Sequence, residues 1–131
     1  MSDNPDTPKP RIGAGDVQIT LLDPAGNPEA LVLRPNYNAA RTISAQSGGL
    51  MGAIERVSKL DLETITQVIT LGLGYGTQSA RGPKDLPQRI YATGLTDDPG
   101  GLAERCVLYL QVLMSGGQMP RKADDGDPPQ R

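Results

Sequence analysis

Apolar and polar residues follow two different periods along this chain of 131 residues. Val17, Ile19 and Leu21 alternate with polar neighbours, which is the period of a strand with one buried face. A run of turn-forming residues at 23–28, Asp-Pro-Ala-Gly-Asn-Pro, separates them from a second apolar run. We therefore predict a β-hairpin over residues 17–34. It needs a supporting surface, because an isolated hairpin is only marginally stable in water.

The remaining apolar residues recur at helical spacing, most clearly in residues 62–73. One face of this predicted helix carries five apolar side chains: Leu62, Ile65, Val68, Ile69 and Leu73. Asp61 is expected to cap its first turn, and the glycines from Gly72 onward are expected to end it. Burying such side chains stabilises a fold by about 1.5–3 kcal/mol each, so this helix should lie at the centre of a small core.

Four further short helices are expected, at about 37–46, 50–59, 86–94 and 100–114. Asn36 is the expected N-cap of the first of these, and Pro87 suits the first turn of the fragment at 86–94. Asp98 and Pro99 are the start signal of the last helix. Pieces of this length must pack on one another, since helices of about 10 residues are not stable alone.

The pattern predicts one α+β domain at residues 16–117: an N-terminal β-hairpin packed on a small bundle of about five short helices. The flanking stretches 1–15 and 118–131 are polar and rich in proline, so we expect a disordered arm and a disordered tail.

The composition limits both the core and the partners of this domain. There is no Phe or Trp, so the core must consist of Leu, Ile, Val, Met and Ala. A net charge of −2 argues against a general nucleic-acid binder, which needs a basic surface. One cysteine cannot form an internal disulfide, no apolar run reaches the ~20 residues that cross a bilayer, and the acidic N-terminus is unlike a secretory signal. These features predict a cytosolic protein that does not bind membranes.

No constellation of residues indicates catalysis. Cys106 falls in an apolar helical stripe, and the chain has no histidine to activate it or to help bind zinc. The glycines at 72–76 follow a helix, whereas those of phosphate-binding loops precede one. The acidic run at 124–127 lacks the twelve-residue pattern of a calcium loop. We therefore expect a protein that is not an enzyme and has no catalytic, cofactor-binding or metal-binding residues.

Candidate partner-binding residues fall in two places. Leu50, Met51 and Ile54 lie on the predicted helix 50–59 and could contact another polypeptide, although the same residues could belong to the core. Arg81, Lys84 and Arg89 make a basic stretch that could meet an acidic partner or simply be a solvated loop, and Arg81 and Lys84 are its candidate contact residues.

The order of elements resembles that of a known family. The predicted hairpin is followed by Leu-Arg-Pro-Asn-Tyr-Asn-Ala-Ala at 33–40, a Gly-Gly break, a short amphipathic helix, a Leu-x-x-Ile-x-x-Val-Ile helix and a glycine-rich stop at 70–74. This arrangement, over roughly Asp16 to Met114, resembles the small tail proteins of siphophages and gene transfer agents, which are classed as phage tail assembly chaperones or tail-tube proteins.

The resemblance implies a protein in the cytoplasm of the bacterial host that coats the tape-measure protein while a phage tail is built. Its partners would be the tape-measure protein and other tail proteins, self-association is expected, and the finished particle would lack it. A structural tail component of the virion, such as a tail-tube or tail-completion subunit, is the alternative. A small DNA-binding regulator is a weaker hypothesis, because the paired helices at 50–59 and 62–73 carry few cations.

Overall fold

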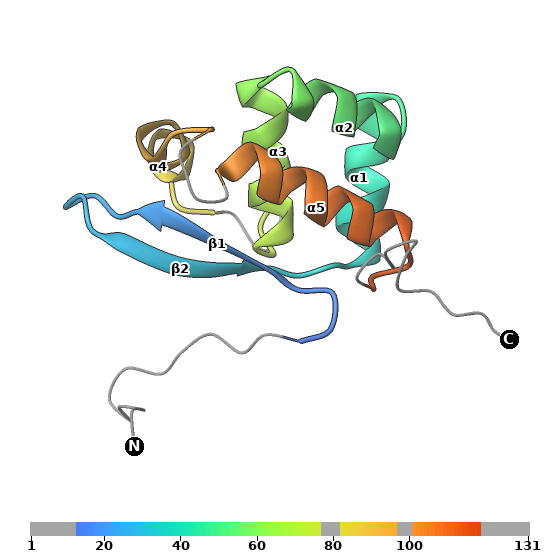
Figure 1. Ribbon diagram of the computed structural model, residues 1–131, viewed down its shortest axis with the longest axis horizontal. Coiled ribbons are helices and arrows are strands. Elements are labelled where there is room, and N and C mark those ends of the chain that lie inside the picture. Colours follow the sequence, from blue (N-terminus) through green and yellow to red (C-terminus); the bar gives the residue numbers. More distant parts are fainter. Residues whose placement is uncertain (1–12, 77–81, 97–100, 119–131) are drawn as a thin grey trace, which may run out of the picture.

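The structure is a computed structural model that describes residues 13–76, 82–96 and 101–118. Within these ranges an antiparallel hairpin comes first and five helices follow it (Figure 1), which confirms the predicted α+β arrangement. The elements are β1 (Val17–Leu22), β2 (Pro28–Leu33), α1 (Tyr37–Ser47), α2 (Leu50–Ser58), α3 (Leu62–Gly72), α4 (Leu86–Thr93) and α5 (Leu102–Met114).

The hairpin has the alternation that the sequence predicts. Val17, Ile19 and Leu21 are buried on one face of β1, and Val17 pairs with the buried Leu33 of β2. Asp23 shapes the connecting turn, because its Oδ1 accepts hydrogen bonds from the N–H groups two and four residues later. The buried face of the hairpin therefore needs a cover.

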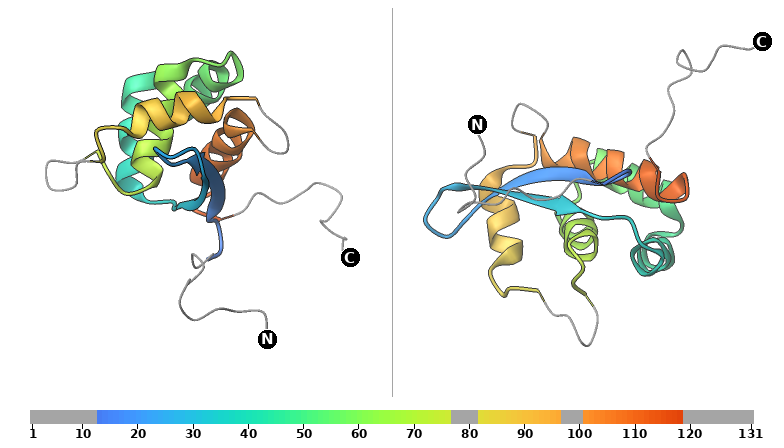
Figure 2. Two further views of the ribbon diagram at one scale, coloured as in Figure 1. Left: turned by 90° about the vertical axis from the view of Figure 1, so that its left-hand side faces the viewer. Right: turned by 90° about the horizontal axis from the view of Figure 1, so that it is seen from below.

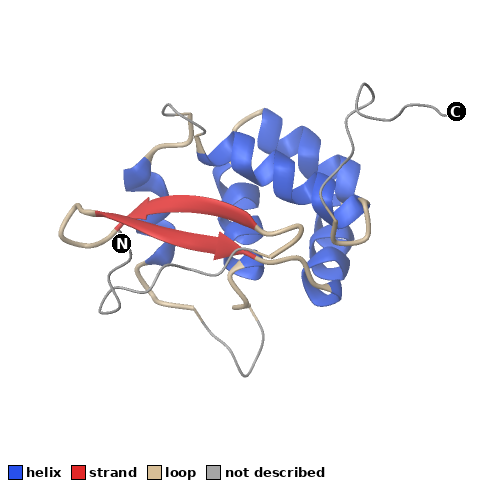
Figure 3. Cartoon of the chain, turned by 60° about the horizontal axis from the view of Figure 1, so that its bottom comes forward, coloured by secondary structure: helices blue, strands red, loops and turns tan. Residues whose placement is uncertain are grey.

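The helices supply this cover from one side. The hairpin lies in front of them in Figure 3, and α5 runs over β1 and α2 (Figures 1 and 2). In α3, the predicted core residues Ile65, Val68 and Ile69 are fully buried, and Leu73 is half-buried. The expectation for Leu62 was wrong: it is 37% exposed, because it begins the helix at the periphery of the bundle.

The predicted helix caps are partly confirmed. The N–H of Ala39 donates to Asn36 Oδ1 at 2.7 Å, so Asn36 is the N-cap of α1. Asp61 does not cap α3 through its side chain; its Oδ2 instead accepts a hydrogen bond from the Thr64 hydroxyl at 2.8 Å. The start signal at Asp98 and Pro99 lies outside the described residues.

The helix bounds differ from the predicted ones by one or two residues. The helices α2, α3 and α4 each end one residue earlier, α1 ends one residue later, and α5 begins at Leu102 with Gly101 as its N-cap. Such shifts are expected, since the last turn of a helix gives weak sequence signals.

The folded region begins earlier than the predicted boundary at residue 16. Two hydrogen bonds close a turn between Gly13 and Asp16. The N–H of Asp16 donates to the Gly13 carbonyl oxygen, and the N–H of Gly13 donates to Asp16 Oδ2. Gly15 is buried, and a Cβ there would lie 2.1 Å from the carbonyl oxygen of Gly117. This backbone contact joins the start of the hairpin to the end of α5. The rest of the predicted arm, and the predicted tail from residue 119, lie outside the described residues.

Candidate partner-binding surface

The three predicted contact residues of α2 lie near one another but differ in exposure. Met51 is 63% exposed, whereas Leu50 and Ile54 are half-buried and pack against the core. Ala53 and Val57 form the fully buried side of this helix. The surface of α2 therefore offers one protruding, flexible apolar side chain with two partly covered ones beside it, which we call the α2 patch (Leu50, Met51 and Ile54).

Of the predicted basic residues, Lys84 lies elsewhere in the described structure. Lys84 is exposed just before α4, Arg81 lies outside the described residues, and α4 is at the opposite end of the molecule from α2 (Figure 1). Arg89, from the same basic stretch, has a structural role. Its Nε donates to the carbonyl oxygen of Leu22 at 2.7 Å and its guanidinium pairs with Glu29. The structure thus separates Lys84 from the apolar candidates.

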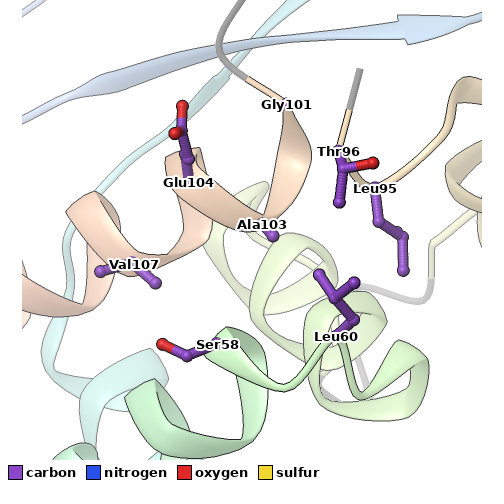
Figure 4. Close-up of a pocket in the computed structure, with 8 residues that line it drawn as sticks. All are labelled: Ser58, Leu60, Leu95, Thr96, Gly101, Ala103, Glu104 and Val107. Carbon is purple, nitrogen blue, oxygen red and sulfur yellow. The ribbon is translucent and has the colours of Figure 1, made fainter. Parts of the chain in front are cut away.

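A pocket that sequence reasoning missed lies between the α2–α3 turn and the start of α5 (Figure 4). It has a volume of about 400 Å³ and is mainly apolar. Leu60, Leu95 and Val107 contribute apolar side chains, while the carboxylate of Glu104 points away from Leu60. Leu60 is 44% exposed and has a φ of 63°, a left-handed conformation that is strained for leucine.

A second cavity, of about 440 Å³, follows β2. Its lining takes in the consecutive residues 29–32 and Arg34 from the strand region. The opposite wall consists of residues around the end of α3 and the start of α4: Leu73, Tyr75, Pro83, Leu86 and Arg89. We call this cavity the β2 groove. Lys84, one of the predicted binding residues, is the immediate neighbour of Pro83 in its wall.

Partly buried polar contacts hold the hairpin against α5 and α3. Asp16 is 7% exposed and accepts a hydrogen bond from the Arg34 guanidinium at 2.6 Å. The hydroxyl of Tyr109 donates to the Arg34 carbonyl oxygen at 2.8 Å, and the Arg34 N–H donates to the carbonyl oxygen of Gly72. Arg34 therefore fixes the end of β2 to both helices.

Tyr109 is the largest fully buried side chain among the described residues. Burial raises the pKa of its phenol, and the negative charges of Asp16 and then Cys106 act in the same direction. The prediction that the core consists only of Leu, Ile, Val, Met and Ala was therefore wrong at Tyr109. A signal was available, since it is three residues from Cys106 and four from Leu113 in the predicted stripe.

The residues that could have carried out chemistry or bound an ion have structural roles instead. Cys106 is fully buried, and desolvation raises its pKa to about 12, so its thiol stays protonated and unreactive at neutral pH. Gly72 is the last residue of α3, and Gly74 and Gly76 have positive φ in the connection that follows. In the described part of the chain, His, Cys, Asp and Glu side chains form no group of three that could hold a metal ion.

Comparisons with known proteins identify no relative whose function could be compared with the surfaces described above. No family model, curated protein or solved structure matches the chain. None of the helices in the described ranges has the length and apolar character that crossing a bilayer requires.

Proposed function

We propose that this protein is a phage tail assembly chaperone-like protein that binds apolar segments of the tape-measure protein in the cytoplasm of the bacterial host. The observation that supports this proposal is the apolar surface of the small domain. Met51 and Leu60 are exposed by 63% and 44%, and each lies next to half-buried apolar side chains. Such work needs an exchangeable apolar interface and no catalytic group.

The character of the surface fits a reversible complex. Met51 can adapt to irregular apolar partners, because methionine is unbranched and flexible. The α2 patch and the pocket at Leu60 are small compared with the ~1,600 Å² of a standard stable interface, so contact through them alone is expected to be weak. Weak contacts repeated by many copies along a long partner would protect it and still give way to tail-tube subunits.

A structural tail component of the virion is the second candidate. The specific observation in its favour is the β2 groove, because a strand edge next to a cavity can pair with another subunit. The two hypotheses differ in where the protein ends up. Mass spectrometry of purified particles should find a structural subunit at high copy and should not find a chaperone.

The α2 patch provides the direct test of the chaperone hypothesis. A purified fragment of the tape-measure protein is titrated with the wild-type protein, Met51→Lys and the control Gln111→Lys. Met51 and Gln111 are both exposed helical residues, so neither charge should disturb the core. We expect Met51→Lys to weaken binding about tenfold or more and Gln111→Lys to leave it nearly unchanged. Equal binding by the wild type and Met51→Lys would remove the α2 patch from the proposal, and no binding by the wild type would refute the chaperone function.

A further inference from the structure

The β2 groove runs along the outer edge of β2. Successive side chains of a strand point to opposite faces, so a cavity on one face would contact alternate residues only. The lining of this cavity includes all four residues from Glu29 to Val32 and none from β1. The cavity must therefore follow the strand at the edge that faces away from β1.

Hydrogen bonds at both ends of the hairpin show which backbone groups face this edge. The N–H of Arg34 points away from β1, since it donates to the Gly72 carbonyl oxygen of α3 at 2.8 Å. On the other strand, the N–H of Leu22 points away from β2, since it donates to the Thr93 hydroxyl of α4 at 2.8 Å. Because the backbone groups of a strand alternate in direction, those of Ala30 and Val32 must face the groove in the same way as Arg34.

The two edges of the hairpin differ in how they are covered. At β1, the N–H of Leu22 bonds to Thr93 and its carbonyl oxygen accepts from Arg89, so side chains of α4 close that end. At β2, no hydrogen bond within the described residues joins the backbone of Ala30 or Val32 to another element. Pro28 has no N–H, so the free edge extends only from residue 29 to the Arg34 contact.

We infer that this edge of β2 binds an extended segment of a partner polypeptide as a third strand. The inference rests on the proposed function and names the mode of binding. Ala30 and Val32 each present one donor and one acceptor, and an added strand would satisfy these groups by β-augmentation. Leu73 and Tyr75, which are half-buried in the opposite wall, would contact the alternate side chains of the segment that point towards the helices.

The length of the free strand edge and the charges beside the β2 groove indicate which kind of segment would bind there. The edge that could pair is short, because Pro28 has no N–H at one end and the Arg34 N–H is bonded to the Gly72 carbonyl oxygen at the other. Its length therefore matches a short extended segment.

Glu29 in the lining is paired with Arg89. The exposed Lys84 adjoins the wall residue Pro83. Because Glu29 is already paired, the positive charge of Lys84 beside the wall favours a segment that carries an acidic residue next to its apolar ones.

The test uses the full chain and a synthetic blocked peptide, Thr-Val-Thr-Val-Thr-Asp, with a second peptide in which lysine replaces the aspartate. Hydrogen exchange of the wild-type protein is followed by NMR with and without each peptide. Before addition, the N–H groups of Leu31 and Leu33 should be protected by β1, and that of Ala30, which is exposed, should exchange faster than that of the buried Val32. With the aspartate peptide, we expect the protection of Ala30 to rise about tenfold or more, and the lysine peptide should raise it less.

A matched pair of variants then isolates the backbone contribution. Ala30→Pro removes the outward N–H and places ring atoms in the groove, while it spares the hydrogen bonds to β1. Ala30→Ser keeps the N–H. We expect the proline variant to lose peptide binding about tenfold or more and the serine variant to bind like the wild type. Circular dichroism and hydrogen exchange of Leu31 and Leu33 check that the hairpin is intact in both.

The outcomes separate this inference from the proposed function. If the tape-measure fragment binds the wild type and Ala30→Pro equally well, strand addition is wrong and the chaperone hypothesis survives. If the peptide protects Ala30 but the fragment does not bind, the edge is a strand-binding site and the chaperone hypothesis fails. If neither peptide changes exchange at Ala30, or if Ala30→Pro only changes the oligomeric state of the free protein, the inferred occupant is wrong.

Discussion

Leu60 occupies a backbone position that favours glycine, and this gives a sharp prediction about stability. The N–H of Leu60 donates to the Val57 carbonyl oxygen at 2.8 Å. The N–H of Asp61 donates to the Arg56 carbonyl oxygen at 3.0 Å. These two bonds form a Schellman motif that ends α2, with Leu60 at the left-handed position where glycine is most common. We therefore predict that Leu60→Gly is more stable than Leu60→Ala.

The expected difference follows from comparing two variants that lose the same half-exposed side chain. The Cβ of alanine costs about 1–2 kcal/mol in a left-handed conformation. This advantage of glycine is reduced by about 0.4–1 kcal/mol, because the unfolded chain with glycine has more conformational entropy to lose on folding. The balance favours glycine by about 0.5–1 kcal/mol. At Gln111, an exposed position of α5, the order should be reversed, with alanine better by about 1 kcal/mol.

Urea denaturation of Leu60→Gly, Leu60→Ala, Gln111→Gly and Gln111→Ala measures these differences in the free energy of unfolding. The comparison requires that the m-values of the two variants in each pair agree. The glycine variant at residue 60 and the alanine variant at residue 111 should each have the higher midpoint of their pair. Equal or greater stability of Leu60→Ala would refute the assignment of strain to this turn. If Leu60→Gly is also as stable as the wild type but binds the tape-measure fragment more weakly, the leucine side chain serves binding rather than folding.

Three further predictions concern the fold. Gly15→Ala should cost more than 2 kcal/mol in a urea titration, because its Cβ would meet backbone 2.1 Å away, whereas Gly48→Ala, with open space around it, should cost about 1 kcal/mol. Tyr109→Phe removes the hydrogen bond to the carbonyl oxygen of Arg34 and should lower the free energy of unfolding by about 1–2 kcal/mol. Burial raises the pKa of Cys106 from 9.0 to about 12, so the unfolded state loses this proton first, and stability should fall between pH 9 and 12 by up to about 1.4 kcal/mol per unit. Cys106→Ala should show a shallower fall over the same pH range in the same assay, and an identical fall would contradict the prediction.

Local patterns predicted the elements of the fold because each depends on neighbours in sequence. The alternation around Ile19, the helical spacing around Ile65 and the cap at Asn36 are all local signals. The side-chain role of Asp61 was predicted wrongly, because the nearby Thr64 hydroxyl competes with the backbone for the same carboxylate.

The candidate surfaces were less predictable, since they depend on contacts between distant elements. The β2 groove needs the end of α3 and the start of α4 to lie beside residue 30, and no local pattern specifies that. The strain at Leu60 arises because a Schellman turn imposes a left-handed backbone on a residue whose type gives no such signal. The prediction for Lys84 depended on its charge alone, whereas its position next to Pro83 in the wall of the β2 groove depends on the fold.

Calorimetric titration of the purified protein with a purified tape-measure fragment, repeated at several temperatures, tests the central claim most directly. We predict saturable binding with a negative heat-capacity change, because apolar surface is removed from water. Absence of heat at every temperature, together with recovery of the protein at high copy from purified particles, would contradict it.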